Sequence, residues 1–344
     1  MIDDMGPRLT DDDGLPRPSS AGPPTGPLPG GYVRRGRGPR PPFDARLRRM
    51  GWWVLYAAAA IGGLFGLGML WFHLTSDPLA DVRAYYDAAR RLNAGQPLYA
   101  ATGDATTPTY YFYPPMLAIL MRPFAGLPFH VFAVGWEVVV LASFVALLRR
   151  LGANRRTYVA LGLLGMPIGW ALAIAQAHVP MTLLMAIGQP WSIALATNIK
   201  LFPVLVAVWW LGRRQYQAVG ALAGWLILLG FLQWLIEPDG SVAFFGAVGL
   251  DETAGVRNIS PYAISPILWA VLGVAGAVGA LFLAPTRWGW AAAVALATLA
   301  SPRLIVYMLT GLLAGVREPD PPRGEGPYDL PPPDAAEVYV SSAR

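Results

Sequence analysis

The chain has 344 residues, of which 55% are hydrophobic and only 14% are charged, and its formal net charge is +5. Soluble domains carry about 25% charged residues, so this composition excludes an ordinary soluble domain and indicates a protein embedded in lipid. The chain contains no cysteine, which excludes disulfides, thiolate nucleophiles and cysteine-bound zinc. Its three histidines are widely spaced along the sequence and do not predict a metal site.

Both ends of the chain have a composition typical of disorder. Residues 1–48 are rich in Pro, Gly and Arg, and residues 317–344 include three consecutive prolines. Such segments bury too little apolar surface to offset the entropy cost of ordering the chain. We therefore expect a disordered tail over 1–48, a membrane domain over 49–316 and a second disordered tail over 317–344.

Long apolar runs fill the central part of the chain, and five of them approach the roughly 20 residues that cross a bilayer. These five runs cover residues 51–73, 129–148, 158–175, 216–235 and 263–284. The stretches 180–210 and 290–316 are also apolar but are interrupted by prolines and polar residues. The pattern predicts an all-α polytopic helical bundle in contact with membrane lipids, with about eight or nine membrane segments, some short or re-entrant.

The distribution of basic residues predicts the orientation of these segments. Arginines gather before Gly51, over residues 149–156 and at Arg213–Arg214. Since basic loops stay on the cytoplasmic side, we expect a cytoplasmic N-terminus. The first outer loop then covers residues 74–128. The side of the C-terminal tail stays open, and the basic residues need no nucleic-acid partner because the topology accounts for them.

The same orientation gathers carboxylates on the outer face of the membrane. All acidic residues of the segment 51–316 fall in outward loops except Glu137, which lies inside a span and which we interpret as structural. Topology explains basic residues on the inner face but does not explain acidic residues on the outer face. We therefore look for the chemistry of this protein outside the membrane.

The first outer loop contains an amphipathic segment. Five apolar residues recur there at helical spacing, and Gly95 and Pro97 are typical of a helix end; the five are Val82, Tyr85, Tyr86, Ala89 and Leu92. The pattern predicts an interfacial helix that begins near Asp81. Two interpretations of Asp81 are open: a helix cap, or a carboxylate held at the membrane surface as a base.

Lys200, the only lysine in the chain, lies in the otherwise apolar stretch 194–208. A charge inside a membrane is costly and usually faces a partner or a cavity. The lysine is therefore either a structural charge, snorkelling or paired with Glu137, or a cation for a phosphate. Arg303 and His178 are further candidates for contacts with a phosphate or a sugar.

Several motifs occur in an order that resembles glycosyltransferase family 87. The resemblance covers roughly residues 75–310, and its first-loop motifs are the most specific. They are Asp81-x-x-x-Tyr85, then Gly95-x-Pro97-x-Tyr99, then Tyr113-Pro114-Pro115. Weaker similarities follow at Gln176, at Lys200-x-x-Pro203 and at Ser301-Pro302 with Tyr307.

The resemblance implies a GT-C-type fold and an enzyme of the plasma membrane. Such enzymes move a sugar, here mannose or another hexose or pentose, from a polyprenyl-phosphate donor to a hydroxyl of a lipid or glycan acceptor. Transfer takes place on the outer face with inversion, and an aspartate of the first outer loop acts as general base. The matching residue is Asp81, with Asp77 in reserve. Tyr85, Tyr113 and Gln176 are the matching substrate-binding candidates, and we expect no metal or other cofactor.

Two other classes of function stay open. The interrupted spans and the intramembrane charges Glu137 and Lys200 are compatible with a secondary transporter or a lipid flippase. Many transporters contain two related halves, which are not visible in this sequence. A non-catalytic membrane scaffold that binds partners through its tails is the other alternative.

Overall fold

The computed structural model describes residues 42–99, 111–247 and 258–320, and all regular structure in them is helical. The tails predicted to be disordered fall mostly outside these residues. Among the described residues, 42–50 belong to one compact unit and those from Gly51 onward belong to another. The predicted all-α fold is confirmed. In chain order the helices are α1 (Pro42–Ser76), α2 (Ala80–Asn93), α3 (Pro115–Met121), η1 (Arg122–Phe124), α4 (Phe129–Leu151), α5 (Arg155–Leu163), α6 (Gly165–Ala173), α7 (His178–Ile187), α8 (Pro190–Ile199), η2 (Phe202–Val206), α9 (Ala207–Gly212), α10 (Tyr216–Ile236), α11 (Pro238–Ala247), η4 (Pro261–Ala263), α12 (Pro266–Leu283), α13 (Gly289–Leu299) and η5 (Val306–Val316).

Four helices in the described residues are long and apolar enough to cross a membrane: α1 from Ala45, α4, α10 and α12. Large apolar side chains on them are exposed, for example Trp71, Ile227 and Phe282. Exposed apolar surface of this extent needs an apolar solvent, which the lipid provides. Five shorter apolar segments join them within the same described residues, as the prediction of short membrane segments requires.

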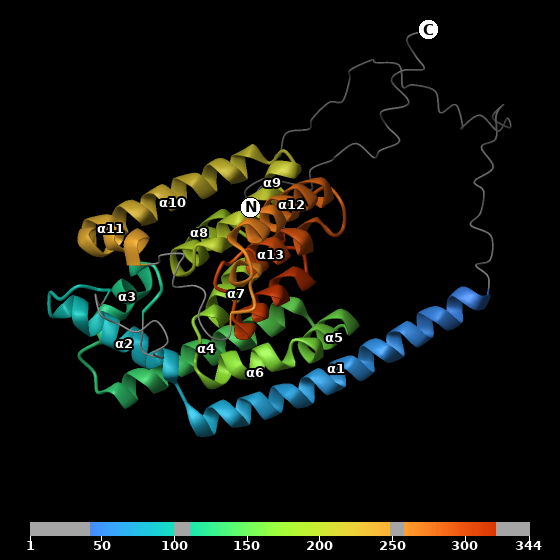
Figure 1. The fold of residues 1–344 in the computed structure, drawn as a ribbon, viewed down its shortest axis with the longest axis horizontal. Coiled ribbons are helices and arrows are strands. Elements are labelled where there is room, and N and C mark those ends of the chain that lie inside the picture. The colour runs from blue at the N-terminus through green and yellow to red at the C-terminus, as the bar shows by residue number, and fades with distance from the viewer. Residues whose placement is uncertain (1–41, 100–110, 248–257, 321–344) are drawn as a thin grey trace, which may run out of the picture. The chain divides into compact units, whose positions relative to one another are not determined.

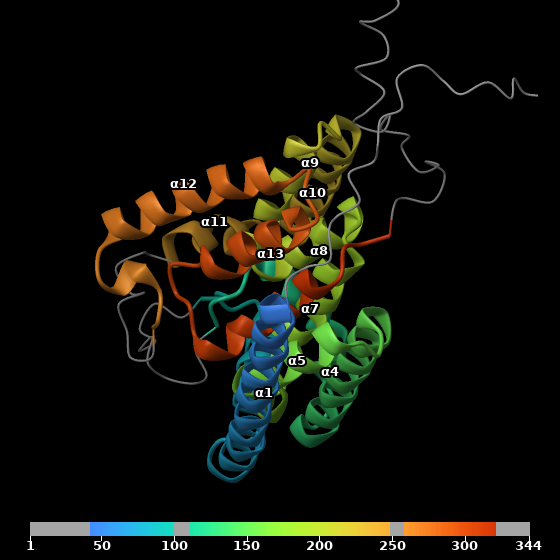
Figure 2. The ribbon, with the colours of Figure 1, turned by 90° about the vertical axis from the view of Figure 1, so that its right-hand side faces the viewer.

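The long helices surround a set of short, buried ones. Helix α4 packs against α7, α10 against α8, and α12 against α13, while η5 contacts α6, α7 and α13 (Figures 1 and 2). The short helices α6, α7, α8, α13 and η5 bury many of their side chains. Helix ends and turns therefore lie inside the bundle, where polar side chains can be held away from lipid.

One apolar run does not form the single span that its length suggests. Residues 158–175 are divided between α5 and α6, with a break at Leu164, whose φ is −94° and ψ is 13°. Pro167 has no N–H and cannot donate a helical hydrogen bond to the carbonyl of Leu163, four residues earlier. The two short helices agree with the expectation that some segments are short, although average hydropathy does not detect the missing donor.

The last described residues are attached to the arginine-rich ends of two helices. Arg317 donates to the Arg150 carbonyl at 2.8 Å, and Glu318 forms an ion pair with Arg213 at 2.8 Å. Asp320 also forms an ion pair with Arg150 at 3.4 Å. Residues 317–320 therefore lie on the same side of the bundle as Arg150 and Arg213.

Helix α1 approaches α5 and α6 through glycines. A Cβ added to Gly62 would overlap the carbonyl oxygen of Gly162, and one added to Gly66 would overlap the backbone of Gly165. Small residues allow the backbones of membrane helices to come this close. The adjacent Gly63 has nothing within 4 Å of such a Cβ, so the close contact is confined to one face of α1.

Replacing Gly62 by alanine should destabilise this contact, because the neighbouring atoms are backbone and cannot move away. We expect a loss of about 1–3 kcal/mol of stability, seen as a lower midpoint of thermal unfolding in detergent. Gly63→Ala is the matched control and should leave the midpoint unchanged or slightly higher. Equal midpoints for the two variants would contradict the close approach of the helices.

Candidate active site

The carboxylate of Asp81 is held by a side-chain amide and does not cap its own helix. Asp81 lies in the first turn of α2, directly after the left-handed Leu79 (φ 56°) and Ala80. No side-chain hydrogen bond caps this end of α2 in the described structure. The amide nitrogen Nε2 of Gln176 donates to Oδ2 of Asp81. The helix-cap interpretation is therefore wrong, and the carboxylate is held from a distant part of the chain.

Gln176 is oriented by two tyrosine hydroxyls. It lies fully buried in the turn between α6 and α7, next to Ala175, whose φ is 51°. Its Oε1 accepts hydrogen bonds from Tyr85 at 2.7 Å and Tyr113 at 2.5 Å. Because the amide oxygen faces these two donors, the amide NH₂ group faces Asp81. The network fixes both the amide and the carboxylate that it contacts.

Hydrogen bonds to two backbone carbonyls hold the turn that carries Gln176 in place. The indole of Trp136 on α4 donates to the carbonyl of Ala175 at 2.8 Å. The N–H of Leu79, two residues before Asp81, donates to the carbonyl of Ala173 at 3.3 Å. The start of α2 and the turn after α6 are thus linked directly, although they lie far apart in the sequence.

Lys200 places a buried amino group beside this network, and burial lowers the pKa of that group to about 7. It follows α8 in extended conformation, with φ −145°. Its Nζ lies 5.4 Å from the ring centroids of both Tyr113 and Tyr307, within the range of cation–π attraction. In the described part of the chain, Nζ is buried and has no hydrogen-bond partner, and no ion pair joins it to Glu137. The pairing of Lys200 with Glu137 is therefore not observed.

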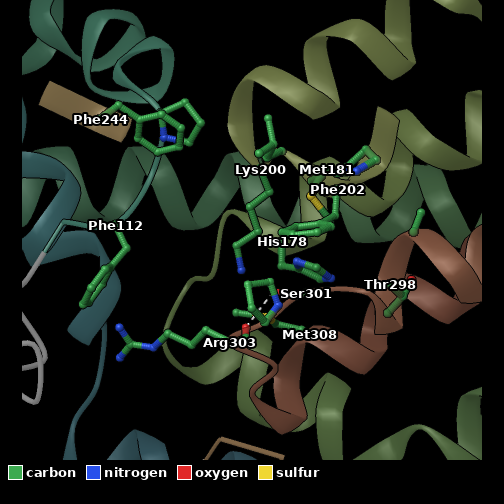
Figure 3. Close-up of a pocket in the computed structure, with 15 residues that line it drawn as sticks. Phe112, His178, Met181, Lys200, Phe202, Phe244, Thr298, Ser301, Arg303 and Met308 are labelled. Atoms are coloured by element: carbon green, nitrogen blue, oxygen red, sulfur yellow. Dashed lines mark hydrogen bonds between the residues drawn. The ribbon is translucent and has the colours of Figure 1, made fainter. Parts of the chain in front are cut away.

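A cavity of about 140 Å³ opens beside Lys200. Three of its lining residues are basic, namely Lys200, Arg303 and His178, and most of the others are apolar. The guanidinium carbon of Arg303 lies 3.9 Å from the ring centroid of Phe112. Figure 3 shows Lys200 and Arg303 extending from different segments toward the same side of the cavity. A cavity with this lining can hold an anionic group together with apolar or ring-shaped parts of a ligand.

Comparisons with known proteins identify the family of this chain. The sequence pattern of glycosyltransferase family 87 matches residues 111–315, which is more than half of the chain. The chain belongs to glycosyltransferase family 87. The predicted family is therefore confirmed.

One curated relative of this family 87 chain is a polyprenol-phosphate-mannose-dependent α-(1-2)-phosphatidylinositol pentamannoside mannosyltransferase from Mycolicibacterium smegmatis. The two sequences are 26% identical over 220 residues, which are 58% of this chain and 52% of the relative. The chain therefore spans about half the length of the curated relative that it matches. No solved structure matches the chain.

The family 87 structure brings most of the predicted site residues together. Tyr113 links the Asp81–Gln176 network to Lys200. Its hydroxyl donates a hydrogen bond to Gln176, and its ring faces Nζ of Lys200. Asp77 lies near enough for its charge to act on Asp81, but its own Oδ1 accepts hydrogen bonds from His73 Nδ1 at 2.6 Å and from Ser76 at 2.8 Å. The reserve aspartate is thus engaged with its own segment of the chain.

The environment of Asp81 makes its carboxyl group less acidic than usual. Burial raises the pKa of Asp81 to about 7, because the charged form loses contact with water. The positive charges of Lys200 and Arg303 act in the opposite direction, but their effect is smaller than that of burial. The negative charge of Asp77 adds to the increase. Asp81 can therefore bind and release a proton near neutral pH.

Sequence reasoning missed three residues around this site. Trp136 orients the turn of Gln176, and Phe112 and Thr298 line the cavity. Phe112 could have been found, because it lies within the aromatic run that leads to Tyr113. Trp136 and Thr298 give no local signal, since one aromatic and one hydroxyl residue are ordinary components of apolar helices.

Proposed function

We propose that this family 87 protein transfers a sugar from a polyprenyl-phosphate donor to a hydroxyl of a lipid or glycan acceptor. The observation that carries the proposal is the buried amino group of Lys200, which lines a cavity and acts electrostatically on Asp81, a carboxyl group that titrates near neutral pH. The printed name of the mycobacterial relative supports a donor of the polyprenyl-phosphate-mannose type.

In the proposed reaction Asp81 is the general base. The acceptor hydroxyl attacks the anomeric carbon of the donor sugar, and its proton moves to the Asp81 carboxylate. The bond between the anomeric carbon and the phosphate oxygen breaks, so that the configuration inverts and polyprenyl phosphate leaves. A base in this role must lie within hydrogen-bond reach of the hydroxyl and have a pKa near the working pH. The position and the pKa of Asp81 support this role.

The leaving phosphate is proposed to bind Lys200 and Arg303. A phosphodiester carries one negative charge, and the phosphate monoester that leaves carries up to two. The cations beside the cavity therefore stabilise the charge that develops during transfer. No metal ion is needed in this scheme, because the two side chains supply the positive charge.

Asp81 is a better candidate for the base than Asp77. Asp81 is held by the neutral amide of Gln176, and the charges of Lys200 and Arg303 act on it. Asp77 accepts hydrogen bonds from His73 and Ser76 on α1. A carboxylate bound in this way is less free to take a proton from a substrate.

We propose that the site opens on the outer face of the membrane. Tyr86 of α2 donates to the carbonyl of Leu127, just before α4, at 2.7 Å, whereas Arg149 and Arg150 lie at the far end of α4. Helix α4 has 23 residues, enough to cross a bilayer. If the arginines are cytoplasmic, as the positive-inside rule favours, then α2 and Asp81 lie outside and the residues after η5 lie inside.

Replacing Asp81 by asparagine tests the proposed base. The variant keeps the shape of the side chain but cannot accept the proton, so transfer from polyprenyl-phosphate-mannose in membranes should fall by about 10²- to 10⁴-fold. Asp77→Asn is the matched control and should keep most of the activity. Full activity of the Asp81 variant, at equal protein levels, would remove Asp81 from the mechanism.

The pH dependence of kcat/KM provides a second test. Because Asp81 must be deprotonated and Lys200 protonated, and burial brings the pKa of each group to about 7, kcat/KM should rise with pH below about 7 and fall above it. A phosphodiester donor does not titrate in this range, so the change belongs to the enzyme. The measurement is a profile between about pH 5 and pH 9 with saturating acceptor. A flat profile contradicts the assignment.

Lys200→Met tests the phosphate contact. Loss of a charge-assisted hydrogen bond should weaken the binding of polyprenyl phosphate by roughly 10- to 100-fold. The fold should tolerate the change, because methionine is apolar and has a similar length. Arg287→Met, which removes an exposed charge remote from the cavity, is the control. Unchanged affinity in the Lys200 variant would show that the phosphate binds elsewhere.

A further inference from the structure

Two uncharged polar groups line the cavity without a partner. His178 is 3% exposed and Thr298 is 5% exposed. Within the described residues, the hydroxyl of Thr298 has no hydrogen-bond partner, and the ring of His178 is approached only by the backbone of Met308, without a hydrogen bond of ordinary geometry. Buried polar atoms in proteins are normally paired, and those that are not need an explanation.

The two groups lie close to each other beside Gly311. A Cβ added to Gly311 would lie 2.9 Å from Thr298 Oγ1 and 3.0 Å from His178 Nε2. Both side chains therefore meet beside the backbone of Gly311, where even a Cβ would lie too close to them. Figure 3 shows His178 and Thr298 on the opposite side of the cavity from the guanidinium of Arg303.

The chemistry of this pair suits a hydroxyl better than a phosphate. A threonine hydroxyl both donates and accepts, and a neutral imidazole has one donor and one acceptor nitrogen. A sugar hydroxyl has the same dual character, whereas ionised phosphate oxygens only accept and fit the cations Lys200 and Arg303. Most of the remaining lining is apolar, as expected for a pocket in which a few polar groups orient the ligand.

We propose that His178 and Thr298 form a hydroxyl-binding subsite for the sugar of the donor, a role that rests on the proposed function. The donor then lies with its phosphate at Lys200 and Arg303 and its sugar ring toward α7 and α13. In this arrangement the pair selects the sugar, because a site built to bind a hydroxyl discriminates against ligands that lack it.

Binding measurements with two ligands test the subsite. The purified full-length protein is titrated with polyprenyl-phosphate-mannose and with polyprenyl phosphate, which has no sugar. Thr298→Val removes the hydroxyl at nearly constant volume and should weaken binding of the first ligand by roughly 3- to 10-fold, leaving the second unchanged. Thr298→Ser, which keeps the hydroxyl, should restore wild-type affinity.

Thr310→Val is the matched control. Thr310 is also fully buried with an unpartnered hydroxyl in the described structure, but it does not line the cavity. Its substitution should leave the affinity for both ligands unchanged. A loss in this variant equal to that of Thr298→Val would overturn the subsite, since the effect would then come from the fold.

The wild-type protein gives a test that needs no variant. Polyprenyl phosphates carrying mannose with a single hydroxyl removed are compared with the complete donor. We expect one of them to bind roughly 3- to 10-fold more weakly and to be insensitive to Thr298→Val. Equal affinity for all of them overturns the subsite but leaves the proposed function standing. Failure of the wild type to bind any of these ligands overturns the proposed function as well.

Discussion

The amide of Gln176 is the contact on which the rest of the site depends. Its oxygen accepts hydrogen bonds from two tyrosine hydroxyls, and its nitrogen donates a hydrogen bond to Asp81. All of these groups lie within an apolar bundle. A buried network of this kind is stable only when its members are paired, and here the pairing also fixes the direction of the carboxylate. Because Gln176 is neutral, it holds Asp81 without adding the positive charge that would keep the carboxyl group permanently ionised.

The arrangement of long and short helices makes such a network possible in a membrane. The long helices α1, α4, α10 and α12 present apolar side chains at the surface, while helix ends and turns lie among the short helices inside. Turns carry backbone groups and polar side chains that lipid would not tolerate. The break at Leu164 likewise divides one apolar run into two short helices, and the turn after the second one, with Gln176, meets the start of α2.

Two elements show how far sequence reasoning reaches. In α2 the five apolar residues at helical spacing are all buried, and the helix ends at Asn93, just before Gly95, as the glycine and proline predict. A local pattern was sufficient because one face of this helix meets the core. The role of Asp81 could not be decided in the same way. Position at a helix start favours a cap, and only the fold reveals that Gln176, 95 residues later, binds the carboxylate.

The sequence by itself determined that this protein lies in a membrane, that its fold is all-α, which family it belongs to and which residues are candidates for the active site. Hydropathy, charge placement and short motifs are properties of neighbouring residues, so they can be recognised without a fold. The tertiary structure alone decided which candidates meet: Lys200 between the rings of Tyr113 and Tyr307, and Asp81 against the amide of Gln176. These contacts join segments far apart in the chain, and their geometry depends on how helices pack, which no local pattern encodes.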